Sequence, residues 1–374
     1  MIPAAGKDDR QTVWADPASV RTRLEHALSG EPAQWPVYLV YDWFVKHRPI
    51  DWPSLFAQGL GQIMHADLVR VTHPHLEIVE TRQEIDGRQR RVVRWLTDHG
   101  QLQESFIGDW QQEYLVKRPE DYRILRRAFE DTRYTATAEF FHEAEAQVGD
   151  NGITLGVLGW APLRRTPLLQ VQIDFAGPER FALDLADEVP ELMDLLELLS
   201  ELTLAKFREA VKTPARYLKL WENLAIETIG PGRYRQRIVP MYNRILEILS
   251  AAGKRLLVHY DGKLRSIAGD IAALALDIDS LTPPPEGDIP VAEARAAWPE
   301  KFLWLHPPLG WFHEPAPILA QRIRQMVRDA GPCRYCLMIS EDVPPRWEEQ
   351  VRVVLDTLRD RKERPTLPTQ RDIP

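Results

Sequence analysis

The sequence predicts a (β/α)8 barrel, a closed sheet of eight parallel strands surrounded by helices, with an N-terminal extension and inserted antiparallel hairpins. Two observations lead to this prediction. Short apolar runs rich in β-branched and aromatic residues alternate with segments of helical apolar spacing, and the connections are short. About eight such runs occur, which is the number that closes a barrel of this kind.

The first 75 residues predict an extension followed by the first barrel elements. Residues 1–30 form the extension, with one amphipathic helix that ends at Gly30. A buried strand begins at Trp35, because the run is apolar, aromatic and bounded by proline. A helix is then predicted over 51–66 and a second barrel strand over 66–75.

An antiparallel insertion is predicted over residues 77–107, where polar and apolar residues alternate with a period of two. Asp86-Gly87 supplies one chain reversal, since Asp-Gly between alternating segments is a strong hairpin signal. Asp98, His99 and Gly100 supply a second reversal. We therefore expect about three strands inserted between barrel elements.

Strands and helices alternate again through the rest of a domain predicted to span 31–362. The predicted strands cover 154–160, 215–222, 255–261, 277–283, 301–308 and 334–342. Residues 363–374 are charged and proline-rich, so they are predicted to form a disordered tail.

Composition excludes several classes of protein. The chain of 374 residues has 47 basic and 55 acidic side chains, a net charge of −8, whereas a nonspecific nucleic-acid binder needs a basic surplus. No run approaches the roughly 18 apolar residues that span a bilayer, and the first residues lack the apolar core of a secretory signal. We expect a cytoplasmic protein without nucleic-acid or membrane partners, whose two cysteines, Cys333 and Cys336, are structural thiols.

The candidate site follows from the predicted fold, because barrel enzymes place their chemistry at the carboxyl ends of the strands. The polar and aromatic residues at or just after those ends are Asp42, His73, His75, Trp160, Glu222, Asn223, His259, Asp261, His306, Glu341 and Asp342. We expect them to converge on one mouth and to bind a small substrate.

His259 and Asp261 are the most informative pair, since residues two apart at a strand end aim at the same side. They could be metal ligands, with Glu341 or His306 completing a nitrogen and oxygen set for zinc or iron. They could equally be an acid–base pair in which the carboxylate orients the imidazole. A histidine held by a loop hydrogen bond is the third alternative.

The sequence also contains an ordered set that resembles the metal ligands of the amidohydrolase superfamily: His73, His75, Lys219, His259, His306 and Asp342. This resemblance implies a metal-dependent hydrolase. That superfamily carries its HxH pair on the first strand and its lysine on the fourth. The strand count from this sequence places HxH on the second strand and Lys219 on the fifth, which argues against the assignment.

The C-terminal half carries an acidic strand end at Glu222, a helix with Pro240 that ends at Gly253, the segment DIDSLTP and a closing ISEDVPP. In these features residues 217–343 resemble the uroporphyrinogen decarboxylase superfamily, which includes corrinoid-linked methyltransferases such as methylcobamide:coenzyme M methyltransferase. The upstream EYLVKRPEDYRILRRAF and the Asp-Gly hairpin resemble the methyltransferase side, so the likeness extends over 35–362. It implies a (β/α)8 barrel.

The resemblance also implies a metal site. In the methyltransferases zinc is held by the His and Cys of an HxC motif and by a distal Cys; here His259 matches the first, and Asp261 and Glu341 match the two cysteines. The implied ligands of a zinc or iron ion are therefore these three residues. The implied reaction moves a methyl group between a corrinoid or pterin carrier and a small substrate, with a corrinoid protein as partner.

The roles of the other site residues follow from the same resemblance. Glu222 is expected to contact the substrate or act as a base, and Trp160 and His306 are expected to line the mouth. The remaining expected substrate contacts are Asp42, His73, His75 and Asn223.

Other functions stay open. The decarboxylase proper binds its tetrapyrrole through an arginine-rich N-terminal motif, whereas this chain has only Lys46 and Arg48 there. A metal-independent decarboxylase or lyase is still an alternative, with Glu222, His259 and Glu341 transferring protons on a carboxylated, tetrapyrrole-like substrate. A noncatalytic binding protein is a further alternative, and barrels of this size often form homodimers.

Overall fold

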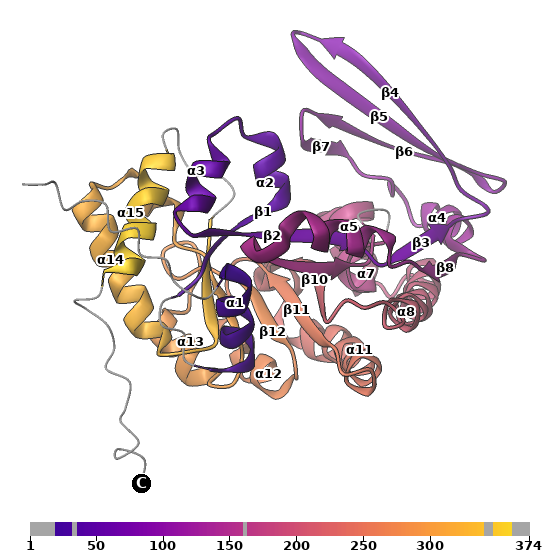
Figure 1. Cartoon of the computed structure of the whole chain (residues 1–374). Coiled ribbons are helices and arrows are strands. Elements are labelled where there is room, and N and C mark those ends of the chain that lie inside the picture. The colour runs from indigo at the N-terminus through magenta and orange to yellow at the C-terminus, as the bar shows by residue number, and fades with distance from the viewer. Residues whose placement is uncertain (1–18, 32–35, 160–162, 340–346, 361–374) are drawn as a thin grey trace, which may run out of the picture.

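Eight parallel strands close a barrel in the computed structural model, which describes residues 19–31, 36–159, 163–339 and 347–360 (Figure 1). The barrel strands follow one another around the sheet in chain order and are β1 (Tyr38–Tyr41), β2 (Leu60–Asp67), β9 (Gly152–Val157), β10 (Tyr217–Leu224), β11 (Arg255–Tyr260), β12 (Asp277–Leu281), β13 (Leu303–Leu305) and β14 (Tyr335–Met338). The predicted fold class is confirmed.

Helices surround the barrel (Figure 1). Their bounds are α1 (Val20–Ser29), α2 (Asp42–His47), α3 (Trp52–Ala57), α4 (Asp121–Phe129), α5 (Glu139–Val148), α6 (Pro167–Leu169), α7 (Pro178–Ala186), α8 (Pro190–Ala210), α9 (Ile226–Ile229), α10 (Pro231–Arg233), α11 (Val239–Ala251), α12 (Ala268–Ala273), α13 (Val291–Ala297), α14 (Ala316–Ala330) and α15 (Trp347–Arg359). None of these described helices has the length and apolar character that a membrane crossing needs.

The barrel interior and the layer between barrel and helices are two separate cores. Residues of each strand alternate between them, because successive side chains of a strand point to opposite faces. The interior core includes Leu39, Tyr217, Leu257 and Trp304. Helix α1 contributes Leu24 to this core and contacts β2, β9 and β14, so the predicted N-terminal helix packs against the barrel.

The second barrel strand lies earlier in the chain than the sequence predicts. The predicted helix over 51–66 ends at Ala57 as α3, and β2 begins at Leu60. The helix stops because Gly59 takes a positive φ of 90°. Close packing then requires Gly61, since an added Cβ would lie 2.4 Å from a Val20 methyl carbon.

The predicted second barrel strand over 66–75 is therefore wrong. Its residues contain β3 (Val69–Thr72), which pairs antiparallel with β8 (Arg133–Ala136) in a separate two-stranded sheet. The alternation of apolar and polar residues is real, but it reflects a strand outside the barrel.

The antiparallel insertion forms a four-stranded sheet that projects from the barrel (Figure 1). Its strands are β4 (Glu77–Ile85), β5 (Arg88–Thr97), β6 (Gly100–Ile107) and β7 (Trp110–Glu113). Asp86 and Gly87 both have positive φ, as a two-residue hairpin turn requires. The sheet has one strand more than predicted, because β7 follows the predicted end of the insertion.

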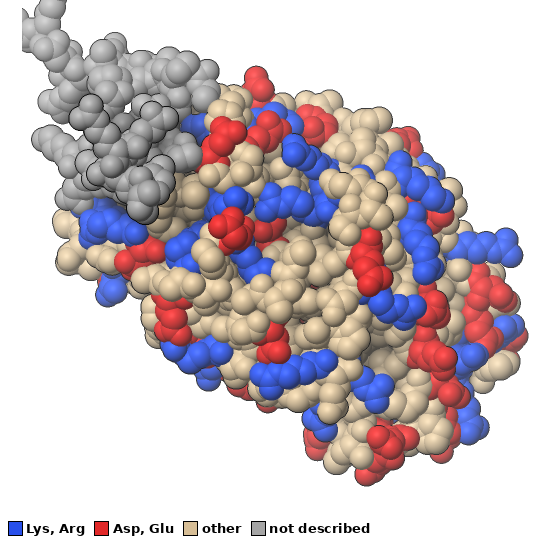
Figure 2. Space-filling view, turned by 90° about the horizontal axis from the view of Figure 1, so that it is seen from below, with Lys and Arg blue, Asp and Glu red and all other residues tan. Residues whose placement is uncertain are grey.

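Charges of both signs are interspersed on the face of the molecule that Figure 2 shows, so neither sign forms a continuous field over that face.

Candidate functional site

Four strands bring a buried charged cluster together inside the barrel, toward the carboxyl ends of β1 and β11. The Lys219 ammonium from β10 lies 2.5 Å from a carboxylate oxygen of Asp279 on β12, and both side chains are fully buried. The Tyr41 hydroxyl, at the end of β1, donates to the other Asp279 oxygen at 2.8 Å. The His259 Nδ1 atom on β11 lies 3.3 Å from Asp279 Oδ2. Asp279 is thus the centre that its three neighbours share.

Asp279 stays ionised in this setting. Burial alone would raise the pKa of its carboxyl group, but the charge of Lys219 and the hydrogen bond with His259 outweigh burial and hold that pKa far below its usual range. The buried carboxylate therefore carries a full negative charge at neutral pH, which fixes the orientation of the His259 ring.

His259 lies between two carboxylates. Its Nε2 atom is 3.4 Å from Asp261 Oδ1, and the Asp261 side chain is half-exposed. Asp261 also accepts a hydrogen bond from the Asn223 side-chain amide at 2.9 Å. Burial opposes protonation of His259, but the hydrogen bonds with Asp261 and Asp279 prevail, so the pKa of His259 lies above its ordinary value of 6.5.

Aromatic rings line the same end of the barrel. Tyr41 and Trp43 stack at 4.3 Å between ring centroids, and Trp43 lies 5.4 Å from Trp221. The Trp221 centroid is 5.1 Å from that of His259. The Lys219 ammonium lies 3.6 Å from the Trp221 centroid, a cation–π distance that adds to its stabilisation by Asp279.

Two further histidines at this end are neutral. Burial lowers the pKa of His65 to about 4, although its ring bonds Asp42 at 2.8 Å. Burial lowers the pKa of His306 to about 3, and its buried Nε2 atom has no hydrogen-bond partner among the residues that the structure describes. His259 is thus the histidine of the three whose pKa is raised.

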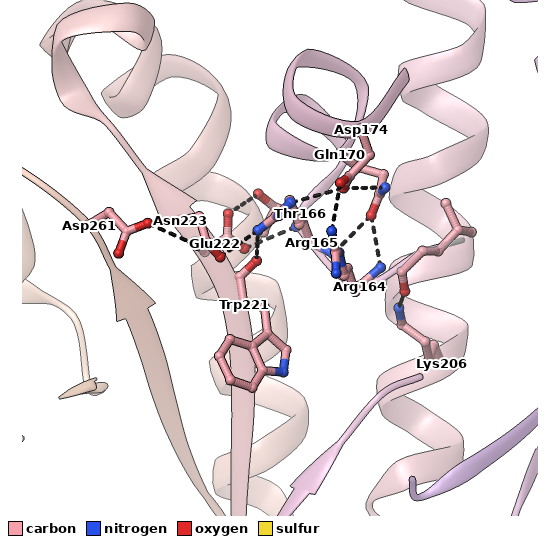
Figure 3. Close-up of polar contacts among 11 residues, drawn as sticks. Arg164, Arg165, Thr166, Gln170, Asp174, Lys206, Trp221, Glu222, Asn223 and Asp261 are labelled. Carbon is pink, nitrogen blue, oxygen red and sulfur yellow. Dashed lines mark hydrogen bonds and ion pairs between the residues drawn. The ribbon is translucent and has the colours of Figure 1, made fainter. Parts of the chain in front are cut away.

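A buried arginine holds Asn223 in place (Figure 3). Arg165 donates to the Trp221 carbonyl at 2.6 Å and to the Asn223 side-chain oxygen at 2.7 Å, and it pairs with Asp174 at 2.9 Å. Asn223 itself has a positive φ of 46°, which Asn tolerates better than most residues. Arg165 therefore positions the amide that bonds Asp261.

Glu222 lies on the other face of β10. Both of its carboxylate oxygens accept hydrogen bonds from Thr166, one from the backbone N–H at 3.0 Å and one from the hydroxyl at 2.8 Å (Figure 3). Burial raises the pKa of Glu222 to about 7. The nearby Lys206 ammonium, bonded to the Leu163 carbonyl, has its pKa lowered to about 7 by burial. The structure thus places Glu222 in the layer between barrel and helices.

His73 and His75 follow β3 and contact Thr132 and Asp131. They do not stand at the end of the second barrel strand, as the sequence predicts, because β3 belongs to the separate sheet. The predicted count is also wrong for Lys219, which lies on β10, the fourth barrel strand in chain order.

The predicted metal set can be compared with the structure only in part. His259 and Asp261 come together, whereas Glu341, Asp342 and Trp160 lie outside the described residues. Within the described part of the chain, no three His, Cys, Asp or Glu side chains gather to hold a metal ion. Cys336 is buried and Cys333 half-buried, and both are free thiols.

Several residues of this site were missed as candidates: Tyr41, Trp43, His65, Arg165, Trp221 and Asp279. Strand alternation could have found Asp279, because its buried strand pairs with that of His259 in a register that sets the two residues side by side. His65 lies within the predicted helix over 51–66, and nothing in the sequence marks Arg165.

No family model and no curated protein matches this chain. Among solved structures it is similar to a methyltransferase from Methanosarcina mazei, with a TM-score of 0.54 and 12% identity over 91% of this chain and 98% of that one. A xylose isomerase domain protein from Planctomyces limnophilus matches with a TM-score of 0.35 and 12% identity, over 87% of this chain and 96% of that one. At 12% identity the likeness to the methyltransferase shows the barrel fold alone.

Glu222 gives a prediction about stability. Its pKa is about 7 in the folded protein, against an ordinary 4.5. The folded state therefore binds this proton more tightly, and the resulting stability is fully present below pH 4.5 and lost as the pH rises through about 7. Glu222→Gln should remove this loss, so the variant should gain stability relative to wild type between about pH 5 and about pH 8 in urea unfolding. The exposed Glu179→Gln is the control, and an unchanged pH dependence in Glu222→Gln would contradict the assignment.

Proposed function

We propose that this chain is an enzyme in which His259 exchanges a proton with a small carboxylated substrate at the carboxyl ends of the barrel strands. This is the chemistry of a metal-independent decarboxylase or lyase. The observation that carries the proposal is the position of His259 between the buried Asp279 and the half-exposed Asp261.

The two carboxylates give His259 both orientation and a suitable pKa. Asp279 holds Nδ1, so the ring is fixed and Nε2 faces Asp261. A general acid works best when its pKa is near the working pH, and the raised pKa of His259 moves it in that direction. Since Asp279 remains ionised, it stabilises the imidazolium that forms when His259 takes a proton.

A decarboxylation at this site balances without an oxidant or reductant. The bond between the substrate carbon and its carboxylate breaks, carbon dioxide leaves, and the electron pair remains on the carbon. Protonated His259 then gives its Nε2 proton to that carbon and regains a proton from solvent. Asp261 lies beside Nε2 and accepts a hydrogen bond from Asn223, so these two residues orient the region in which the proton moves.

The aromatic rings provide the other half of the binding surface. Trp221 lies next to His259 and Trp43 lies next to Trp221, and rings of this kind contact flat or apolar parts of a ligand. His306 is neutral, buried and close to His259, at 6.5 Å between ring centroids. Its Nε2 atom supplies a further polar contact for a substrate.

The test uses substitution of His259. His259→Gln should lower turnover by about 10²–10⁴-fold, the usual contribution of a general acid. The assay incubates small aliphatic and aromatic carboxylic acids with the protein in D2O and follows loss of carbon dioxide and uptake of deuterium by NMR. The exposed His142→Gln is the control and should keep wild-type turnover.

Turnover that survives in His259→Gln would contradict the role of His259. A wild-type protein that converts none of the carboxylic acids would contradict the proposed substrate class.

Methyl transfer is the second candidate function. It is supported by the resemblance of His259 and Asp261 to the HxC motif and by the structural likeness to the methyltransferase from Methanosarcina mazei. A corrinoid or pterin carrier and a corrinoid-protein partner belong to this candidate. Zinc that activates a thiol prefers thiolate ligands, and Asp261 supplies an oxygen instead. Both His259 nitrogens also face carboxylates already, so the described residues do not fit such a centre.

Metal content separates the two candidates. If His259 transfers a proton without a metal, protein purified without chelator or polyhistidine tag should contain no stoichiometric zinc or iron. The metal content of Asp261→Ala should be the same as that of the wild type. Elemental analysis measures both, with the exposed Asp109→Ala as control. About one zinc or iron per chain that disappears only in Asp261→Ala would favour a metal-assisted reaction and would contradict the metal-independent one.

A further inference from the structure

Strand β4 forms an open edge of the projecting sheet. The sheet order is β4-β5-β6-β7, so within the described residues no strand pairs with the outer side of β4. The strand is nine residues long, and all of its residues except Val79 are exposed. Its register with β5 runs without a shift from Glu77 to Ile85. Proteins usually block such an edge with a proline, a bulge, a very short strand or charged side chains. Strand β4 has no proline and no bulge, and its charged side chains carry both signs.

The free hydrogen-bonding groups of β4 can be assigned from its turn. In a two-residue hairpin the residues that flank the turn, here Ile85 and Arg88, exchange backbone hydrogen bonds, and the direction alternates along the strand. The even-numbered residues of β4 therefore point their N–H and C=O groups away from β5. These residues are Ile78, Glu80, Arg82 and Glu84.

Two positive charges, one on β4 and one on β5, share a single carboxylate. Arg82 lies directly opposite Arg91 of β5, and like charges in this position repel. One carboxylate serves both, since Glu80 lies 2.6 Å from Arg82 and 3.4 Å from Arg91. A second carboxylate beside Arg82, on the side of β4 away from β5, would balance the two positive charges.

We propose that β4 pairs antiparallel with β4 of a second copy of this chain, about a twofold axis through Thr81. This pairing forms a continuous eight-stranded sheet across the two copies and places Glu80 of each copy opposite Arg82 of the other. It joins four pairs of outward-pointing residues, with about eight backbone hydrogen bonds.

The charge pattern selects this register over its neighbours. An axis through Glu80 would set the two Glu80 carboxylates opposite each other, and an axis through Arg82 would oppose two guanidinium groups. Both arrangements repel. Of these axes, only the one through Thr81 pairs every residue of β4 from Glu77 to Ile85. It also places a second carboxylate, Glu80 of the other copy, beside each Arg82.

Charge reversal tests the pairing. The chain of 374 residues should sediment as a dimer, twice the 43.1 kDa chain mass, in analytical ultracentrifugation. Glu80→Arg should make it monomeric, because the introduced guanidinium would then face Arg82 of the second copy. The double variant with Arg82→Glu as well should restore the dimer, since the two charges exchange places. Glu179→Arg, on an exposed site away from the sheet, should leave the dimer intact, and circular dichroism of each variant shows that it folds.

Cross-linking tests the register independently of charge. Opposite residues on an antiparallel pair have Cβ atoms roughly 5 Å apart, so Thr81→Cys should form a disulfide-linked dimer under mild oxidation. Gln83→Cys is equally exposed, but in this register the two introduced residues lie about 14 Å apart and should not link. A monomeric wild type, a dimer that persists in Glu80→Arg, or equal cross-linking at positions 81 and 83 would each overturn the proposal.

Discussion

The buried pair of Lys219 and Asp279 is the interaction on which the candidate site depends. Two charges removed from water are stable only with close partners, and both side chains here are fully buried. Asp279 therefore gathers Lys219, Tyr41 and His259 around one carboxylate. Because these residues come from four different strands, closure of the barrel is what assembles the cluster. His259 has its orientation and its raised pKa only within this arrangement.

Alternation along the strands decides which polar residues meet. Lys219 and Trp221 of β10 face the barrel interior, so Glu222 faces the helices and bonds Thr166. From the sequence, the polar residues after the strand ends are all predicted to line one mouth, and Glu222 is predicted to act on the substrate. Of the residues predicted for this mouth, Asp261 contacts both His259 and Asn223. Because successive residues of a strand face opposite sides, counting along β10 from Lys219 places Glu222 on the face away from the barrel interior.

The barrel itself could be predicted because repeated alternation of strands and helices is a long-range signal that survives local errors. The second barrel strand could not be predicted, because the apolar residues of Leu60–Asp67 have spacings that suit a helix as well as a strand. Contacts with Val20 and Leu39 around Gly61 decide between the two, and they are made only in the folded chain. The same local ambiguity hid His65, which would otherwise stand out as a polar residue near a strand end.

The central claim is that Asp279 and Asp261 hold His259 as a protonatable group at the site. An NMR titration of the His259 imidazole in metal-free protein tests it most directly. The account predicts a pKa above 6.5 in the wild type and a lower pKa in Asp279→Asn, because the variant loses the carboxylate charge that stabilises the imidazolium. A wild-type His259 that titrates below 6.5, or one whose pKa does not respond to Asp279→Asn, would contradict the account.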